Sequence, residues 1–299
     1  MFATKKRNLK HFLFQLTAMV LIMLLLVSCG GSNPANGNKP ENEGKPDVTA
    51  KQDDRQNANQ EEQQNNQQDV PPKQQQDKVS NGSGPPSTAA DSYVAYMEAK
   101  GDLVAILTDA LANNPGTELY SMSFLGFAMV DLALIPASCF GLGQEAAITA
   151  LGFLGLDDIE YSESGNQYSV KYRNDKGEQY ELHGEYNKAA DALTCISKLN
   201  GKESLVSEYR KTSFGYVGQT YTIGEDGSIY VYQMAVSGKD GAVGISKAAA
   251  APPALTGSET IDFPRQCQEW YAITGAEVTG LASDGEEISF IYTPPADSE

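Results

Sequence analysis

The stretch YSVKYRNDKGEQYEL, residues 168–182, decides the fold because its alternating pattern predicts a complete β-hairpin. A loop over 175–177 ends in Gly177, which supplies the left-handed backbone conformation that three-residue hairpin loops need. The resulting register pairs Tyr172 with Tyr180, Val170 with Leu182, and Lys171 with Glu181. One face of the hairpin is then apolar and the other carries paired charges, and a shift by one residue would scramble both.

The same alternation, starting at Tyr161, predicts further antiparallel strands separated by glycine-containing turns. Four such turns follow the first hairpin: Asn200-Gly201, Glu225-Asp226-Gly227, Lys239-Asp240-Gly241 and Asp284-Gly285. None of the acidic turns continues with the ligand spacing of a calcium loop, so they predict hairpins and not metal sites. We also expect a strand near 260–263, a short helical segment over 264–271 and a last strand over 287–292.

A helix is expected ahead of these strands. Thr88 and Asp91 fit a capping box at its start, and residues 113–116 hold the stop signal Asn-Asn-Pro-Gly. Apolar side chains recur on one face of this predicted helix: Tyr93, Met97, Val104, Leu107 and Leu111.

The apolar stretch 122–156 predicts two short buried helices with a break near Pro136. Asp131, near the middle of the longest apolar run, opposes a membrane span. Alternatively, the stretch lines a cavity for an apolar ligand. The order of elements predicts an α+β fold, with N-terminal helices packed on a mainly antiparallel, meander-like β-sheet. This order is loosely similar to that of envelope lipoproteins that carry lipids, in which helices cover a curved sheet.

Residues 1–28 have the anatomy of a secretory signal, with a basic start, an apolar run over 12–27 and a small-residue end. The sequence Leu-Val-Ser-Cys at 26–29, followed by glycine, resembles the lipobox of bacterial lipoproteins. The resemblance implies cleavage between Ser28 and Cys29 and acylation of the Cys29 thiol. An uncleaved transmembrane helix is the alternative, but about sixteen apolar residues are short for a span of roughly twenty.

Residues 29–89 are expected to form a disordered tether that starts at the lipidated Cys29. After this cysteine the segment has no aromatic residue, and valine is its only large aliphatic one, so it cannot bury enough surface to fold. As a flexible coil of about sixty residues it would have a root-mean-square end-to-end distance of roughly 45 Å. Its Gln-rich part, 60–76, is alternatively a recognition or aggregation element. The predicted location is the outer face of the cell membrane, in an envelope of the Gram-positive type.

The remaining segment, 91–299, is predicted to be a single domain with 30 acidic and 12 basic residues. So acidic a surface repels nucleic acid, and we expect no nucleic-acid partner. The sequence has no glycine-rich phosphate loop, no serine-hydrolase elbow and no paired-histidine motif. We therefore expect neither a cofactor nor a bound metal.

Few residues are candidates for catalysis. His183 is the one histidine left after the signal, and the hairpin register puts it opposite Ser169 on the polar face, as an exposed strand residue and not a member of a triad. The carboxylates of Asp157, Asp158 and Glu160 could do acid–base work on a glycan, but an acidic exit from an apolar segment is usually a solvated loop.

The cysteines and tyrosines allow structural roles as well as functional ones. Export permits a disulfide, and Cys195 with Cys267 is the expected pair if one forms, because Cys139 lies in the apolar stretch as a buried free thiol. Ten of the fifteen tyrosines fall between residues 161 and 232. They predict strand cores with polar edges or, alternatively, an aromatic platform for a glycan or peptide.

Three functions follow from these features. The first is a non-catalytic binding or interaction module at the cell surface, which requires exposed aromatic or apolar surface. The second is a carrier or chaperone for a lipid or other apolar ligand, which requires an enclosed cavity lined by residues of 122–156. The third is an envelope hydrolase that uses two facing carboxylates. The candidate partners are the membrane, through Cys29, and a cell-wall glycan, a protein or an apolar ligand.

Lipidation of Cys29 can be tested by its replacement. A Cys29→Ala variant should lose the mass of the acyl groups and appear in the medium or as an uncleaved precursor, because only a thiol accepts the diacylglyceryl group. Mass spectrometry of the cell-associated and released chains measures both effects. An acylated Cys29→Ala chain would contradict the prediction.

Overall fold

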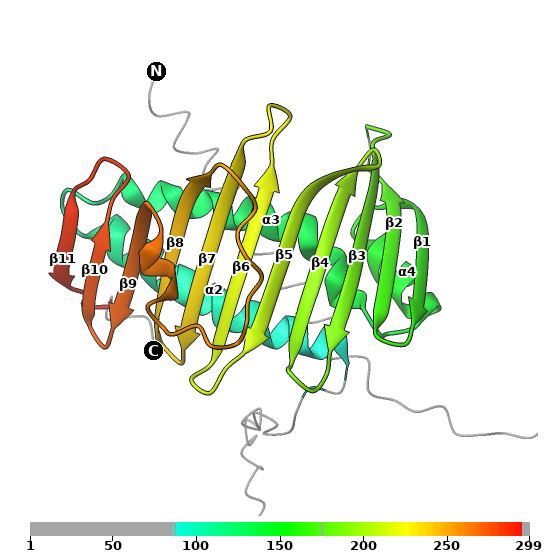
Figure 1. Cartoon of the computed structure of the whole chain (residues 1–299), viewed down its shortest axis with the longest axis horizontal. Coiled ribbons are helices and arrows are strands. Elements are labelled where there is room, and N and C mark those ends of the chain that lie inside the picture. The colour runs from blue at the N-terminus through cyan, green and yellow to red at the C-terminus, as the bar shows by residue number, and fades with distance from the viewer. Residues whose placement is uncertain (1–85, 87, 175, 295–299) are drawn as a thin grey trace, which may run out of the picture. The chain divides into compact units, whose positions relative to one another are not determined.

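The computed structural model describes residues 86, 88–174 and 176–294 (Figure 1). The predicted signal, Cys29 and nearly all of the predicted tether lie outside these residues. The helical elements are α2 (Ala89–Asn113), η1 (Tyr120–Phe124), α3 (Leu125–Leu134), η2 (Ile135–Cys139), α4 (Gln144–Phe153) and η3 (Phe263–Gln266). The strands are β1 (Asp157–Ser164), β2 (Gln167–Arg173), β3 (Gln179–Asn187), β4 (Ala192–Leu199), β5 (Lys202–Lys211), β6 (Tyr216–Ile223), β7 (Ile229–Ser237), β8 (Asp240–Ala248), β9 (Glu269–Thr274), β10 (Glu277–Leu281) and β11 (Glu287–Ile291).

The eleven strands form one antiparallel sheet in which each strand pairs with the next along the chain, from β1 at one edge to β11 at the other. All helices but η3 precede the sheet in sequence. The prediction of a mixed helix and strand domain with a large antiparallel sheet is therefore confirmed. In Figure 1 the helices α2, α3 and α4 lie behind the sheet, on the side that we call the helix face.

The first hairpin has the predicted register. Strands β2 and β3 pair Tyr172 with Tyr180, Val170 with Leu182, Lys171 with Glu181 and Ser169 with His183. The rings of Tyr172 and Tyr180 stack with centroids 5.2 Å apart, and Gly177 has φ +76°. Asn200 and Gly201, in the predicted turn between β4 and β5, also have positive φ. Local turn chemistry thus sets the register of these strands.

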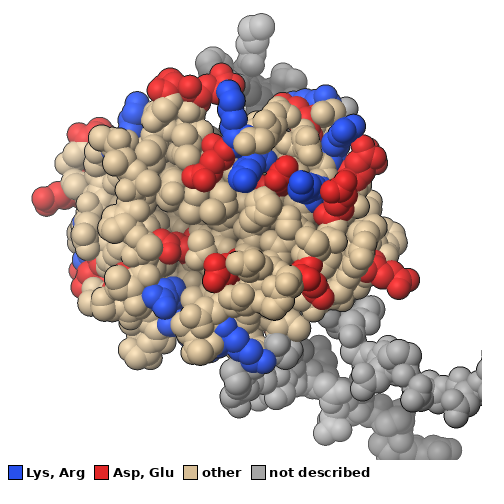
Figure 2. All heavy atoms as spheres, turned by 45° about the vertical axis from the view of Figure 1, so that its right-hand side comes forward, with Lys and Arg blue, Asp and Glu red and all other residues tan. Residues whose placement is uncertain are grey.

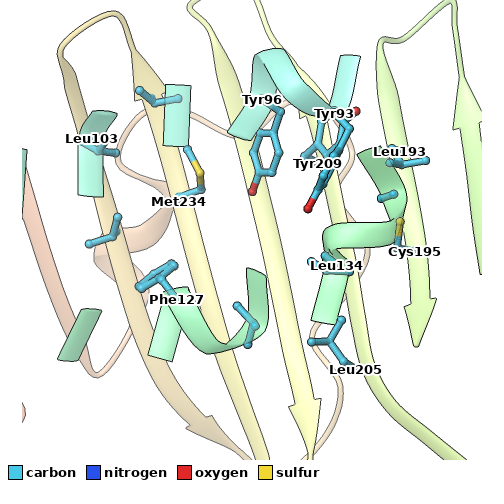
Figure 3. Close-up of a cluster of buried hydrophobic side chains, with 14 of the residues drawn as sticks. Tyr93, Tyr96, Leu103, Phe127, Leu134, Leu193, Cys195, Leu205, Tyr209 and Met234 are labelled. Atoms are coloured by element: carbon cyan, nitrogen blue, oxygen red, sulfur yellow. The ribbon is translucent and has the colours of Figure 1, made fainter. Parts of the chain in front are cut away.

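Helix α2 is the main cover of the helix face. It begins with the predicted capping box between Thr88 and Asp91, and it ends at Asn113. The ring of Tyr96 stacks on that of Tyr209 of β5 with centroids 4.2 Å apart (Figure 3). A Cβ atom on Gly218 of β6 would lie 2.1 Å from the Tyr96 hydroxyl oxygen, so only glycine admits this close crossing of helix and sheet.

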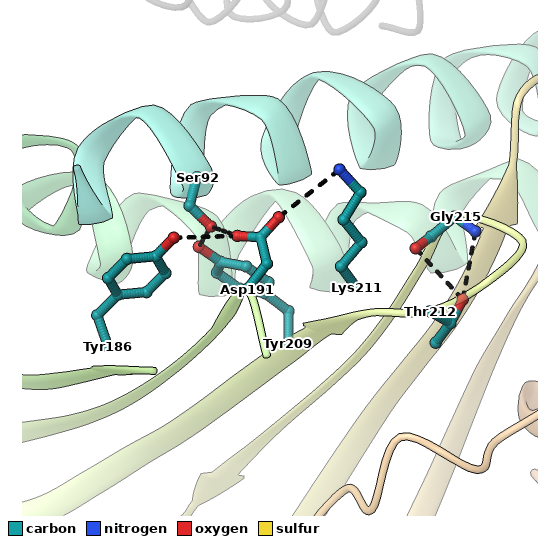
Figure 4. Close-up of polar contacts among 7 residues, drawn as sticks. All are labelled: Ser92, Tyr186, Asp191, Tyr209, Lys211, Thr212 and Gly215. Atoms are coloured by element: carbon teal, nitrogen blue, oxygen red, sulfur yellow. Dashed lines mark hydrogen bonds and ion pairs between the residues drawn. The ribbon is translucent and has the colours of Figure 1, made fainter. Parts of the chain in front are cut away.

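A buried polar cluster fixes the start of α2 to the turn between β3 and β4 (Figure 4). The Ser92 hydroxyl donates to Oδ1 of Asp191 at 2.5 Å and lies 2.7 Å from the Tyr209 hydroxyl. Tyr186 also donates to Oδ1 of Asp191 at 3.2 Å, and Lys211 Nζ lies 3.8 Å from Oδ2. Because Asp191 is 7% exposed, these partners compensate the burial of its charge.

The apolar stretch 122–156 forms η1, α3, η2 and α4, with the break at Pro136 as a 3-10 turn. Phe124 packs against Tyr271 of β9, and Phe127 packs against Tyr232 of β7. Asp131 forms an ion pair with the buried Lys100 of α2. Burial raises the pKa of Asp131, and the Lys100 ammonium counteracts part of that rise.

On the face of the sheet opposite the helices, residues 249–268 cross β6, β7 and β8 (Figure 1), and we call this segment the strap. Glu208 accepts from the backbone N–H of Leu255 at 3.0 Å, and Arg210 donates to the Leu255 carbonyl oxygen at 3.0 Å. Leu255 forms a small second core with Val217 and Ala235. Over β1 to β4 no described element covers this face.

Two predictions in the C-terminal part were wrong. The expected strand at 260–263 is part of the strap, because Ile261 and Phe263 pack on the second core without strand pairing. Of the helical segment expected over 264–271, only the part within η3, which ends at Gln266, is helical, and residues from Glu269 onward form β9. Glu269 is buried in β9, where its carboxylate accepts a hydrogen bond from the Tyr271 hydroxyl at 2.8 Å. A charged residue is not expected at a buried strand position, so the sequence pattern did not indicate that β9 starts here.

The proposed disulfide is also wrong. Cys195 and Cys267 are both free thiols, as is Cys139, which is buried as predicted. Cys195 lies in the core of the helix face, whereas Cys267 belongs to the strap and donates to Gln233 Oε1 at 3.2 Å. The two thiols lie on opposite faces of the sheet, and this separation excludes a disulfide between them.

A substitution at Gly184 of β3 tests how closely the helical layer packs on the sheet. A Cβ atom there would lie 2.2 Å from the Phe140 ring, so Gly184→Ala should lower the free energy of unfolding by about 1–3 kcal/mol. The matched control is Gly152→Ala in α4, where a Cβ atom meets nothing within 4 Å and should leave stability unchanged or slightly raised. Equal effects of both substitutions in chemical denaturation would refute this packing.

The ion pair between Lys100 and Asp131 predicts a second stability effect. Lys100→Met leaves a carboxylate with little solvent and no cation, and should cost about 3 kcal/mol. Adding Asp131→Leu should recover much of that loss, because no unpaired charge remains. The control is Lys171→Met on the exposed Lys171–Glu181 pair, which should cost less than about 1 kcal/mol. Chemical denaturation of the four chains measures these differences, and equal costs for the two single variants would contradict the prediction.

Candidate functional site

Exposed large apolar side chains gather on the helical layer. Among the described residues eight such side chains are exposed, and two of these, Tyr230 and Ile291, belong to the sheet. The other six belong to the segment 119–153, and we call them together the outer apolar surface: Leu119, Met122, Leu125, Met129, Leu142 and Phe153. They are spread along the helical layer, because Tyr120 contacts the turn between β10 and β11 whereas α4 packs on β1 at the other edge of the sheet. Leu119 is 82% exposed, Phe153 77% and Met129 61%. The prediction that the stretch 122–156 is buried is therefore wrong for its outward side.

The outward side chains follow the helical period of η1 and α3. Leu119, Met122 and Met129 are exposed, while Phe124 and Phe127 between them are buried in the main core. The segment thus has two apolar faces, one packed on the sheet and one directed away from it. Leu142 and Phe153 continue the exposed apolar residues next to and within α4.

The outer apolar surface lies in a nearly uncharged part of an acidic domain. Between Glu118 and Asp157 the only charged residues are Asp131 and Glu145. The charge of Asp131 is compensated by Lys100, as described above. The segment from Tyr120 to Cys139 is also long and apolar enough to cross a membrane by length and composition, with 39% of it buried inside the fold.

The chain that precedes α2 leaves the domain beside this surface. The backbone N–H of Ala90 donates to the carbonyl oxygen of Phe140 at 2.9 Å. Thr88 lies against Gly141, at 3.5 Å from the position that a Cβ atom on Gly141 would take. The exposed Leu142 follows directly in sequence. Thr88, near the end of the predicted tether, therefore lies next to Gly141 and the exposed Leu142.

A second candidate region is a hollow of about 390 Å³ over β1, β2 and β3, lined by Asp158, Glu160, Lys171 and Arg173 among others. Figure 2, in which the β1 side of Figure 1 is turned forward, shows Lys and Arg side chains among Asp and Glu. Arg173 lies 3.3 Å from the Asp158 carboxylate. Two of the three predicted carboxylates therefore share a hollow, and Asp157 is not part of its lining.

His183 lies on the polar strand face opposite Ser169, as predicted. Its Nε2 is 3.1 Å from Oε2 of Glu181, and Lys171 Nζ is 3.5 Å from Oε1 of the same carboxylate. These partners, His183 first, lower the pKa of Glu181. The side chains of Lys171 and His183 are 40% and 38% exposed, so the ion pair of Lys171 with Glu181 and the contact of His183 with the same carboxylate contribute little to stability.

The predicted cavity wall does not line either of the two best-formed hollows. The second hollow, of about 500 Å³, lies between residues 212–214 and residues 257–261 of the strap. Neither it nor the hollow over β1 contains a residue of 122–156. Among residues 86, 88–174 and 176–294, no group of three His, Cys, Asp or Glu side chains is placed to hold a metal ion.

Comparison with known proteins assigns no relative to this arrangement. The chain matches no family model, no curated protein and no solved structure. The outer apolar surface and the hollow over β1 are therefore interpreted from their own chemistry.

Proposed function

We propose that this chain is a membrane-anchored extracytoplasmic lipoprotein whose folded domain is a non-catalytic interaction module. Its anchor is the acylated Cys29, its tether is the segment 29–89, and its contact surface is the outer apolar surface. The lipobox-like sequence at 26–29 supports the anchor. The structure of the described domain supports the choice of surface.

The observation that carries the proposal is the concentration of exposed apolar side chains in one segment. Within the described part of the chain, six of the eight large exposed apolar side chains belong to the segment from Leu119 to Phe153, where the charged residues are only Asp131 and Glu145. Single exposed apolar residues are ordinary on protein surfaces, but a group of them in an uncharged region marks a site of interaction.

The hydrolase alternative has one observation in its favour, which is that Asp158 and Glu160 line the same hollow. A glycosidase needs two carboxylates that are both available to the substrate. Here Arg173 engages the Asp158 carboxylate at 3.3 Å, and basic side chains from β2 share the lining. The arrangement fits a solvated ion-pair surface better than a catalytic pair.

The proposal predicts that Met129 is covered on the cell and free in the isolated protein. Met129→Cys and Ile291→Cys chains place a thiol at two sites that are 61% and 70% exposed, while the native Cys139, Cys195 and Cys267 are buried. A maleimide that cannot cross membranes should label both purified chains quickly. On intact cells it should label position 291 at the same rate and position 129 several-fold more slowly.

Ile291 is the matched control because the preceding Phe290 packs on the main core, which turns Ile291 to the opposite face. Equal rates at both positions on cells would show that the outer apolar surface contacts nothing. No labelling at position 291 on cells would contradict the extracytoplasmic location.

A further inference from the structure

We propose that the occupant of the outer apolar surface is the lipid bilayer in which the chain is anchored. This inference rests on the proposed function, and it names the partner of that surface. The domain lies with the outward side of η1, α3 and α4 in the boundary between head groups and acyl chains. Its sheet then faces away from the membrane.

The position of the tether supports a bilayer. The chain joins the domain at Thr88, next to Gly141 and the exposed Leu142. The other end of the proposed tether is the acylated Cys29, so with this surface on the bilayer both ends of the tether lie at the membrane. Since a tether of about sixty residues holds the domain at millimolar effective concentration, even a weak affinity suffices for docking.

The chemistry of the surface also fits the membrane interface. Leu119, Met122, Leu125, Met129 and Phe153 have no hydrogen-bonding group apart from the weakly accepting sulfur of methionine. Apolar side chains of this kind enter the head-group and acyl boundary to a depth of roughly 5–10 Å.

Charge excludes most other orientations on a bilayer. The domain carries 30 acidic and 12 basic residues, so most of its surface repels anionic head groups. From residue 119 to 156 the charged residues are Asp131, which pairs with the buried Lys100, and Glu145. Helix α2 of the same layer carries the exposed Glu98 and Asp102, so only the side formed by η1, α3 and α4 is poor in charge. This side can therefore approach lipid without burying several unpaired charges.

The orientation has a consequence for the rest of the molecule. The face of β1 to β4 that no described element covers lies on the opposite side of the sheet from the helices. With the helical layer on the membrane, this face and the hollow lined by Asp158 and Lys171 point outward. Docking thus presents the polar sheet face to the cell wall and to the surroundings.

Depth-dependent fluorescence quenching tests the docking. The full acylated chain, carrying an environment-sensitive fluorophore on Met129→Cys, is reconstituted by Cys29 into phosphatidylcholine vesicles with a spin-labelled acyl chain as the quencher. We expect a blue-shifted, strongly quenched fluorophore at position 129 and an unshifted, unquenched one on the control Ile291→Cys. Adding Leu119→Glu and Leu125→Glu should abolish the quenching at 129, because two carboxylates cannot enter the boundary.

The outcomes separate the inference from the proposed function. A fluorophore at 129 that is unquenched in vesicles, although position 129 is covered on cells, would overturn the bilayer as the occupant and leave a protein partner. The fluorophore at 129 could instead be blue-shifted but not quenched, and lose its blue shift when the ratio of protein to lipid is lowered. This result would identify a second copy of the chain as the occupant, which also overturns the inference. Quenching at 129 that the two glutamates do not change would overturn it as well.

Discussion

The fold depends on one constraint, which is that the open eleven-stranded sheet has an apolar face that must be buried. Helix α2 meets that need by crossing the sheet at close range, with Tyr96 stacked on Tyr209 and seated on Gly218. The buried carboxylate of Asp191 holds the first turn of the helix through Ser92. A long meander of local hairpins becomes one cooperative domain because these contacts join α2 to strands from the middle of the sheet.

One helix cannot cover eleven strands, and the stretch 122–156 completes the layer. Because the layer is one helix thick, each of its elements has a face on the sheet and a face directed away from it. Phe124 and Phe127 fill the core, while Leu119, Met122 and Met129 point outward. The outward face could have been polar without any loss to the core, so its apolar composition calls for a contact outside the domain.

Local signals in the sequence were sufficient for most of the sheet. The loop ending at Gly177 set the first register, and the capping box at Thr88 located α2. Prediction failed where tertiary contacts override the local pattern. At Glu269, for example, a hydrogen bond from the Tyr271 hydroxyl allows a carboxylate to be buried within a strand. The outward apolar face was missed because a helix that is apolar all round is ordinarily buried. Only the number of strands could have indicated this exposed face, because so wide a sheet is covered by a layer one helix thick, which leaves one side of each helix exposed.

In the proposed docking the helical layer rests on the membrane, and the domain is not suspended away from it on the tether. Neutron reflectometry of the acylated chain on a supported phosphatidylcholine bilayer measures this directly. Docking predicts protein density that begins at the head groups, with no layer of water between them and the folded domain. A hydrated gap between the head groups and the domain, on the order of the tether's root-mean-square length of roughly 45 Å, would contradict it.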